Sequence, residues 1–301
     1  MNTSTQEDAL MRAMPLVFVL IWSTGFIVAR YGMPYAPPMK FLVLRYALSI
    51  LCFLPWIVLA GVAWPCNRRQ WLHLAVSGVL MHAVYHGGVW SAVKAGMGSG
   101  LSALIVGLQP VLTAIWLSST GGQVNRRQWL GLILGFVGLA LVVSGKFGHD
   151  GEVDFLNLSY ALFALLSITI GTLYQKRFVS ECDVRSANTV QLIAALAVTW
   201  PLALLELEPM QWNAQLVSAM AWSVLALTLG GSSLLYMLIQ RGAATTVASL
   251  LYLVPPTTAL IAWVLFDESI TLITLLGTVI TVFGVGLVVR APTEKVLLTK
   301  S

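Results

Sequence analysis

The sequence predicts an all-α integral membrane protein with ten transmembrane helices, arranged as two inverted five-helix repeats. Three observations support this fold class: an apolar composition, ten long hydrophobic stretches and an internal repeat. Of the 301 residues, 58% are hydrophobic and 10% are charged, whereas a soluble domain typically carries about 25% charged residues. A chain this apolar could not cover its own core with polar groups, so a lipid bilayer is the solvent that suits it.

Each hydrophobic stretch is long enough to cross a bilayer, which takes roughly 20 apolar residues. Short polar breaks, or breaks that contain Gly or Pro, separate the stretches and set their boundaries. The predicted spans are 14–33, 40–61, 71–93, 98–118, 127–145, 155–175, 187–205, 216–239, 243–264 and 270–289. They leave only short loops and tails, so we expect no additional soluble domain.

The distribution of Lys and Arg predicts the orientation of the spans, because cytoplasmic loops carry an excess of both residues. With the N-terminus in the cytoplasm, twelve basic residues lie in cytoplasmic segments and four in outer segments, while Arg45 lies within a span. The cytoplasmic set is Arg12, Arg68, Arg69, Arg126, Arg127, Lys176, Arg177, Arg185, Arg241, Arg290, Lys295 and Lys300, and the outer set is Arg30, Lys40, Lys94 and Lys146. We therefore expect both termini in the cytoplasm. Because the basic residues follow the topology and form no cluster, the net charge of +5 does not indicate a nucleic-acid partner.

An internal repeat relates residues 1–145 to residues 146–301. When the sequence is shifted by 146 positions, the two parts align without a gap and several Gly and Pro residues coincide, each of which marks a backbone constraint. The alternative is coincidence in a chain rich in Leu, Ala, Gly and Val. Five spans in each repeat place the second copy upside down, an architecture in which transporters hold substrate between the repeats. The coinciding pairs include Gly25 with Gly171, Pro55 with Pro201, Gly96 with Gly242, Pro110 with Pro256, Gly131 with Gly277 and Gly138 with Gly284.

Three segments carry a family resemblance: Trp22–Phe26 in the first span, Phe41–Tyr46 in the second, and the acidic turn Phe266–Ser269 before the last span. Together with the Pro-bearing fourth and Gly-rich fifth span of each repeat, they make the chain resemble the EamA family of the drug/metabolite transporter superfamily. The resemblance implies a ten-helix fold, a bacterial inner-membrane location and export of amino acids or related metabolites. The first repeat departs from the pattern at Gly121 and Gly122, which stand where the acidic turn would fall.

His82 and His86 are the first candidates for a substrate-binding wall. They are four residues apart and therefore share a face of the third span, which Trp90 continues and Tyr85 adjoins. Neutral imidazoles can hydrogen-bond a substrate and titrate near physiological pH. The alternative is that the two histidines bond helix carbonyls or each other. A metal site would need more ligands, and no Asp, Glu or Cys lies at a similar depth in the neighbouring spans, so we expect no metal.

Arg45 lies a few residues inside the second span, where a charged side chain is costly and usually faces a cavity or a partner. It either anchors the helix near the outer interface or attracts an anionic group of the substrate. Gln191 occupies the equivalent position in the second repeat. Aromatic residues are expected to complete the cavity lining: Trp22, Trp90, Tyr236 and Tyr252.

Proline interrupts the fourth and ninth spans at matching depths. Pro110 follows Gln109 in the fourth span, and Pro255 and Pro256 occur in the ninth. Proline frees a carbonyl one turn earlier, and broken helices at equivalent places in two repeats indicate a central binding site. Gln109 is the natural hydrogen-bonding group for that site, and simple packing kinks are the alternative interpretation.

These features predict a secondary transporter for a small molecule. The sequence has no P-loop, so transport would depend on the gradient of the substrate or of an ion, with protons as the candidate ion and His82 and His86 as their carriers. No cofactor is expected, and the sequence leaves the oligomeric state open. Two alternatives are a non-transporting membrane sensor or assembly protein, and an intramembrane enzyme, for which no motif supplies an acid to orient a histidine base.

Overall fold

The computed structural model describes residues 3–120, 125–146, 152–180, 182–231, 234 and 251–289. This part of the chain is helical, as expected where lipid cannot satisfy backbone hydrogen bonds and each segment must satisfy its own. Six of its helices are long and apolar enough to cross a membrane, and shorter apolar helices accompany them. The six are Pro38–Leu59, Ser99–Trp116, Arg126–Lys146, Phe155–Phe178, Val184–Leu205 and Ala214–Gly231. The expected eighth and ninth spans extend partly outside the described residues.

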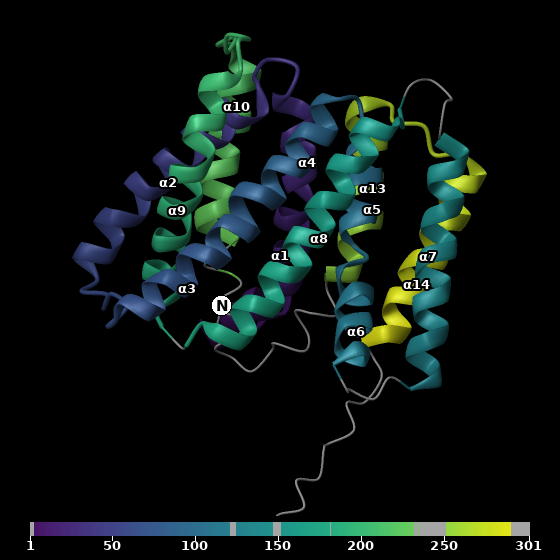
Figure 1. Cartoon of the computed structure of the whole chain (residues 1–301), viewed down its shortest axis with the longest axis horizontal. Coiled ribbons are helices and arrows are strands. Elements are labelled where there is room, and N and C mark those ends of the chain that lie inside the picture. The colour runs from purple at the N-terminus through teal and green to yellow at the C-terminus, as the bar shows by residue number, and fades with distance from the viewer. Residues whose placement is uncertain are drawn as a thin grey trace, which may run out of the picture.

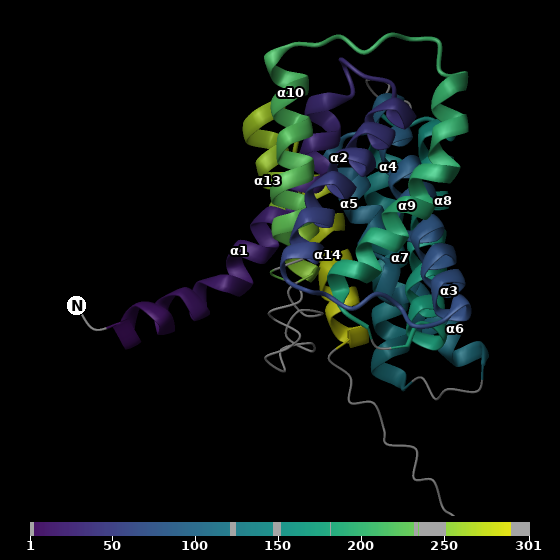
Figure 2. The same cartoon turned by 90° about the vertical axis from the view of Figure 1, so that its left-hand side faces the viewer.

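In the N-terminal part of the chain, helical segments cover each of the five predicted spans, and Figure 1 shows their arrangement. In the third, the α-helices α3 and α4 are joined without a gap by a π-helical segment, and the fourth is broken at Gly107 and Leu108. Helix α1 begins well before its predicted span, and its first turns project away from the bundle (Figure 2). The elements are α1 (Thr3–Gly32), α2 (Pro38–Leu59), α3 (Arg68–Gly78), η1 (Val79–Val84), α4 (Tyr85–Lys94), α5 (Ser99–Val106), α6 (Gln109–Ser119) and α7 (Arg126–Lys146).

The C-terminal part has the same sequence of elements where it is described. A second π-helical segment follows α10, and a short 3-10 turn precedes α13. Asp154 starts α8 with a capping box in which its carboxylate accepts from the backbone N–H of Asn157. The elements are α8 (Phe155–Phe178), α9 (Val184–Leu205), α10 (Ala214–Ala221), η2 (Trp222–Gly231), η3 (Leu251–Leu253), α13 (Val254–Phe266) and α14 (Leu272–Val289).

The two π-helical segments occupy equivalent places in the two parts. Shifted by 146 positions, Val79–Val84 of η1 falls on residues 225–230, inside η2. A serine occupies the equivalent position in each part: Ser77 lies just before η1, and Ser223 lies at the start of η2. Each donates its hydroxyl to the carbonyl three residues earlier, at 2.9 Å in both cases. π-Helical turns are rare and often lie at functional sites. No feature of the sequence predicts them.

Helices of the N-terminal part pack mainly on helices of the C-terminal part. α2 lies against α9, α5 against α13, and α7 against α14, the last pair side by side at one edge of the bundle (Figure 1). α1 contacts η2 and α13, whereas α8 contacts η1 and α4. The core forms two buried clusters, one around Phe41, Tyr46 and Trp90 and the other around Leu104 and Val111.

Glycines bring α7 and α14 into backbone contact. A Cβ atom on Gly131 would lie 2.5 Å from the carbonyl oxygen of Gly284, and one on Gly277 would lie 2.7 Å from that of Gly138. Small residues at such a crossing let two membrane helices approach closely enough for extensive van der Waals contact. The predicted glycine positions therefore join the fifth and tenth spans.

The prolines of the fourth and ninth spans start helices rather than kink them. Pro110 is the second residue of α6 and Pro255 the second residue of α13, positions where the missing N–H has no intrahelical partner. The helix interruption lies one turn earlier, at Gly107. A Cβ atom on Gly107 would lie 2.9 Å from Cγ of Pro255, so the two interruptions pack against each other.

At one end of the bundle, which we call the Lys94 end, carboxylates of the C-terminal part accept hydrogen bonds from the N-terminal part. Glu206 accepts from the backbone N–H groups of Met39 and Lys40, both at 2.9 Å, and so caps the N-terminus of α2. Glu268 accepts from the backbone N–H and the hydroxyl of Ser99, both at 2.9 Å, at the N-terminus of α5. Negative charge is favourable at both places because helix N-termini carry unpaired donors and a positive dipole end. The Arg68 end is the opposite end of the bundle, where α3 begins.

Candidate functional site

A cavity of about 150 Å³ lies in the interior of the bundle, between α1, α2, α4, α8, α9 and the two π-helical segments. Six of the residues that the sequence nominates line it: Trp22, Arg45, His82, Tyr85, His86 and Trp90. Eight further lining residues were not predicted from the sequence: Gly25, Phe26, Tyr46, Met81, Ile168, Leu192, Leu227 and Thr228. Thr228 could have been found by applying the 146-residue offset to His82.

The histidine face predicted for the third span forms one wall of this cavity. His82 and His86 stack with their ring centroids 5.5 Å apart and their planes 19° apart. His86 meets Trp90 edge-on, with centroids 5.4 Å apart and planes at 88°. Tyr46 reaches the same wall from α2 and donates its hydroxyl to the carbonyl of His82 at 2.9 Å. His82 belongs to η1, and His86 and Trp90 belong to α4, so the four-residue spacing brings all three to this face across the end of the π-helical segment.

Arg45 contributes the positive charge of the cavity wall. Arg45 is 7% exposed. Its Nη2 donates to Oγ1 of Thr228 at 3.3 Å, and its Cζ lies 5.4 Å from the ring centroid of Trp90. No aspartate or glutamate lines the described cavity. A buried charge is normally paired with an opposite charge. The Arg45 guanidinium instead has one long hydrogen bond and one aromatic ring as its contacts.

Three nitrogen atoms of the cavity wall are buried and have no hydrogen-bond partner among the described residues. They are Nη1 of Arg45, Nδ1 of His86 and Nε1 of Trp90. Buried polar nitrogens in native proteins are rarely left unpaired, and a group of them needs an explanation. All three residues line the same cavity.

The two parts of the chain place different chemistry at equivalent positions. At the 146-residue offset, Arg45 corresponds to Gln191, and His82 corresponds to Thr228. Arg45 donates to Thr228, and Gln191 interacts with His82. The amide of Gln191 also donates to Oγ of Ser77 at 3.0 Å and to Oε1 of Gln175 at 3.1 Å. The backbone arrangement is repeated, whereas the charge occurs on one side only.

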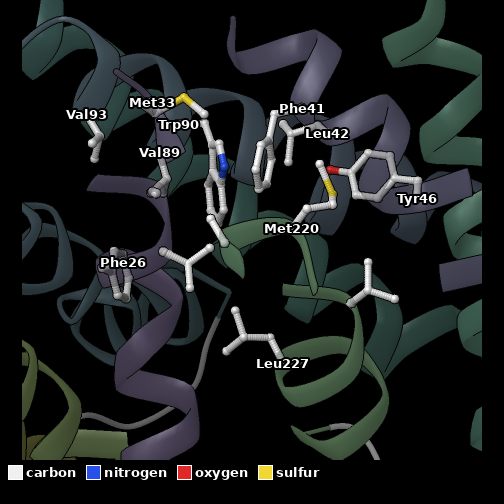
Figure 3. Close-up of a cluster of buried hydrophobic side chains, with 14 of the residues drawn as sticks. Phe26, Met33, Phe41, Leu42, Tyr46, Val89, Trp90, Val93, Met220 and Leu227 are labelled. Carbon is white, nitrogen blue, oxygen red and sulfur yellow. The ribbon is translucent and has the colours of Figure 1, made fainter. Parts of the chain in front are cut away.

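Aromatic and charged contacts close the cavity toward the Lys94 end. Figure 3 shows the Trp90 indole beside the Phe41 ring, and the two residues are 2% and 0% exposed. Beyond them, the ammonium of Lys94 pairs with the carboxylate of Glu208 at 2.8 Å. The Lys94 ammonium, which donates to this exposed carboxyl and lies beside it, lowers the pKa of Glu208.

A second cavity of about 370 Å³ lies toward the Arg68 end, between α3, η1, α8 and α9. Met81 lines both cavities, so only a short layer of side chains divides them. Polar groups such as Gln175, Lys176 and Asn188 line the second cavity. The Arg68 side of the central cavity is thus adjoined by a second, more polar cavity that shares Met81 with it.

The remaining nominated residues lie elsewhere. Gln109 does not line the central cavity; its amide donates to Oγ1 of Thr172 at 2.8 Å. Pro255 lines two much smaller cavities, and Pro110 and Pro256 lie in the first turns of α6 and α13. Tyr236 and the side chain of Tyr252 lie outside the described residues. Within the described ranges, no group of three His, Cys, Asp or Glu side chains could hold a metal ion.

Comparisons with known proteins agree on one family. The sequence profile of the EamA-like transporter family matches residues 12–144 and again residues 156–290. An uncharacterized transporter of Archaeoglobus fulgidus is 25% identical over 278 residues, which are 89% of this chain and 93% of that protein. The uncharacterized inner membrane transporter YedA of Escherichia coli (strain K12) is 26% identical over 273 residues, covering 89% of this chain and 87% of YedA.

A more distant relative has a more specific name. A probable amino-acid metabolite efflux pump of Escherichia coli (strain K12) is 23% identical over 240 residues, which cover 79% of this chain and 71% of the pump. One solved crystal structure matches 91% of this chain and 95% of its own chain with a TM-score of 0.62. At 16% identity, that likeness shows the fold alone.

Proposed function

The chain belongs to the EamA-like transporter family, and from this premise we propose that it is a secondary transporter that exports amino acids or related small metabolites by alternating access. The observation that carries the proposal is the central cavity, which both parts of the chain line and whose wall holds unpartnered nitrogens. A membrane sensor or assembly protein with a closed apolar interior would need neither a central cavity nor unpartnered nitrogens in its wall. The name of the efflux pump among the relatives supports the direction and substrate class.

The proposed architecture is ten spanning helices in two inverted repeats, residues 1–145 and 146–301. The double match of the family profile supports the duplication. The helix contacts support the inversion, because α1 packs on η2 while its counterpart α8 packs on η1. The glycine contacts repeat in the same way. Gly131 and Gly284 correspond, at the 146-residue offset, to Gly277 and Gly138, and both pairs are in contact. Repeats of this kind exchange conformations and open a midplane site alternately to each side.

The proposed orientation places both termini and the Arg68 end in the cytoplasm of a bacterial cell, with the Lys94 end outside. The excess of Lys and Arg on the loops of the Arg68 end supports it. In this orientation the larger second cavity is a cytoplasmic vestibule, and the described conformation is the one closed to the outside.

Exposed Cys66 provides a direct test of the orientation, since it lies beside the Arg68 end and needs no engineering. A membrane-impermeant thiol reagent should leave Cys66 unlabelled in intact spheroplasts and label it in inside-out vesicles. Mass spectrometry of the Cys66 peptide measures the extent of labelling in the spheroplasts and in the vesicles. A Cys66→Ser variant is the control for labelling at other thiols. Labelling from the outside of intact spheroplasts would reverse the proposed orientation.

Transport itself is testable in proteoliposomes without knowing the substrate. Vesicles loaded with isotopically labelled amino acids and their 2-oxo acids should release at least one compound faster than protein-free vesicles, as measured by mass spectrometry. Repeating the assay with a pH gradient, for the wild type and a His82→Gln/His86→Gln variant, tests the proton as coupling ion. If protons are coupled through these histidines, the variant loses its response to the gradient. Identical release from vesicles with and without protein would contradict transport of these metabolites.

A further inference from the structure

We infer that the central cavity binds a small organic anion, with a carboxylate held at Arg45 and an apolar body, in preference to a zwitterion or a cation. The inference rests on the proposed transport function and narrows its substrate class. Its basis is that unpartnered nitrogens, a positive charge without a carboxylate partner and several apolar side chains belong to the lining of one cavity.

The unpartnered nitrogens specify the kind of atom that the ligand must present. Nη1 of Arg45 and Nε1 of Trp90 are obligatory hydrogen-bond donors, and Nδ1 of His86 donates in one of its tautomers. Two or three donors around one space need acceptor oxygens. A carboxylate offers two such oxygens, and its geometry matches a guanidinium fork.

The charge of the cavity favours an anion. Arg45 has no carboxylate partner in the described structure, and its bond to Thr228 is long at 3.3 Å. None of the twelve Asp and Glu residues lies inside the predicted spans, and none of the described ones lines the cavity. Breaking a buried pair is costly because it leaves an uncompensated charge, and a bound carboxylate would supply the missing partner.

The same absence disfavours an ammonium group. A zwitterionic amino acid would bring its positive charge next to Arg45, with no carboxylate among the described lining residues to receive it. Like charges in a low-dielectric site repel strongly.

The apolar part of the cavity lining fits a hydrocarbon body. Phe26 from α1, Ile168 from α8 and Leu227 from η2 belong to it, and Figure 3 shows Phe26 and Leu227 on the side of the cluster away from Met33. Binding sites for small molecules are typically mostly apolar with a few convergent polar groups. The ligand is therefore amphipathic, with its charged end toward Arg45, Trp90 and His86.

A matched series of ligands tests the inference on the purified full-length protein. The probes are 4-methyl-2-oxopentanoate, leucine and 3-methylbutylamine, which share a branched carbon body, and acetate, which lacks it. Ligands that bind the folded state raise the melting temperature. The oxo acid should stabilise most, leucine and acetate less, and the amine not at all. Stabilisation by leucine or the amine equal to that by the oxo acid would overturn the inference, as would no response to the oxo acid at millimolar concentration.

Two variants connect the response to the named residues. Arg45→Gln should raise the dissociation constant of the oxo acid by roughly ten- to a hundredfold, and Trp90→Phe, which keeps the ring but removes Nε1, by a few fold. Arg68→Gln, at an exposed arginine outside the cavity, should change nothing. If Arg45→Gln does not fold, the Trp90→Phe measurement decides alone. An unchanged affinity in every folded variant would remove these residues from the site.

The outcomes separate this inference from the transport proposal. If proteoliposomes release an amino acid and the oxo acid does not bind, the protein is a transporter of another substrate class and the inference fails. If the oxo acid binds as expected and no labelled compound is released, the site stands and the transport proposal fails.

Discussion

Replacing Gly25 with leucine is expected to abolish transport while leaving the fold intact. Gly25 lines the central cavity, and the nearest atom to a Cβ built on it is Cδ2 of Leu227, at an ordinary contact distance of 3.8 Å. Leucine is a good helix former, so the substitution should not weaken α1. Its side chain would occupy much of a cavity of about 150 Å³. We expect the release rate from proteoliposomes to fall below about one tenth of the wild-type rate, because the substrate loses its space.

Gly25→Ala is the matched control, since a single methyl group fits beside Leu227 and leaves most of the cavity free. It should retain transport. The melting temperature and the elution profile in detergent report whether each variant folds. A Gly25→Leu variant that folds and transports at the wild-type rate would show that substrate does not pass through this cavity.

The largest effect on stability is expected from Gly284→Ala in α14. A Cβ atom there would lie 2.6 Å from the backbone nitrogen of Gly135 and 2.7 Å from the carbonyl oxygen of Gly131. Both atoms belong to the backbone of α7, so the clash can be relieved only by separating the two helices. Overpacking of this kind costs about 1–3 kcal/mol. The expected result is a lower melting temperature and a smaller fraction of monodisperse protein after heating.

Gly286 provides the control on the same helix, two residues away. Nothing lies within 4 Å of a Cβ atom built at Gly286. Gly286→Ala should therefore be neutral or stabilising by up to about 1 kcal/mol through helix propensity. Equal stability of the two variants would mean that α7 and α14 do not approach as closely as described.

The helical class of the fold was predictable from the sequence because the constraints that specify it are local. A run of apolar residues must be helical in lipid whatever its neighbours are. The pairing of Gly131 with Gly284 was not predictable, although both glycines stand out in the internal repeat, because contact between helices depends on how the whole bundle assembles. The π-helical segments were missed for the same reason: no residue type specifies them.

The candidate site was predictable where periodicity decides which side chains share a face. His82, His86 and Trp90 repeat every four residues, and the structure brings all three to the cavity with Arg45. Gln109 was nominated because proline frees carbonyls in its neighbourhood, yet the helix interruption packs onto Pro255 and the Gln109 amide turns to Thr172. Apolar lining residues such as Leu227 carry no distinguishing signal in a chain where most residues are apolar.

If the protein exports an organic anion by alternating access, as proposed, the charge of Arg45 makes its transport cycle sensitive to the membrane voltage. With the anion bound, the loaded site would be neutral, and its reorientation would perform no electrical work. The empty carrier would return with one positive charge, and a charge that crosses the full field gains or loses about 2.3 kcal/mol per 100 mV. With the cytoplasm electrically negative, the voltage would favour the return of the empty site to the cytoplasmic side, where an exporter reloads.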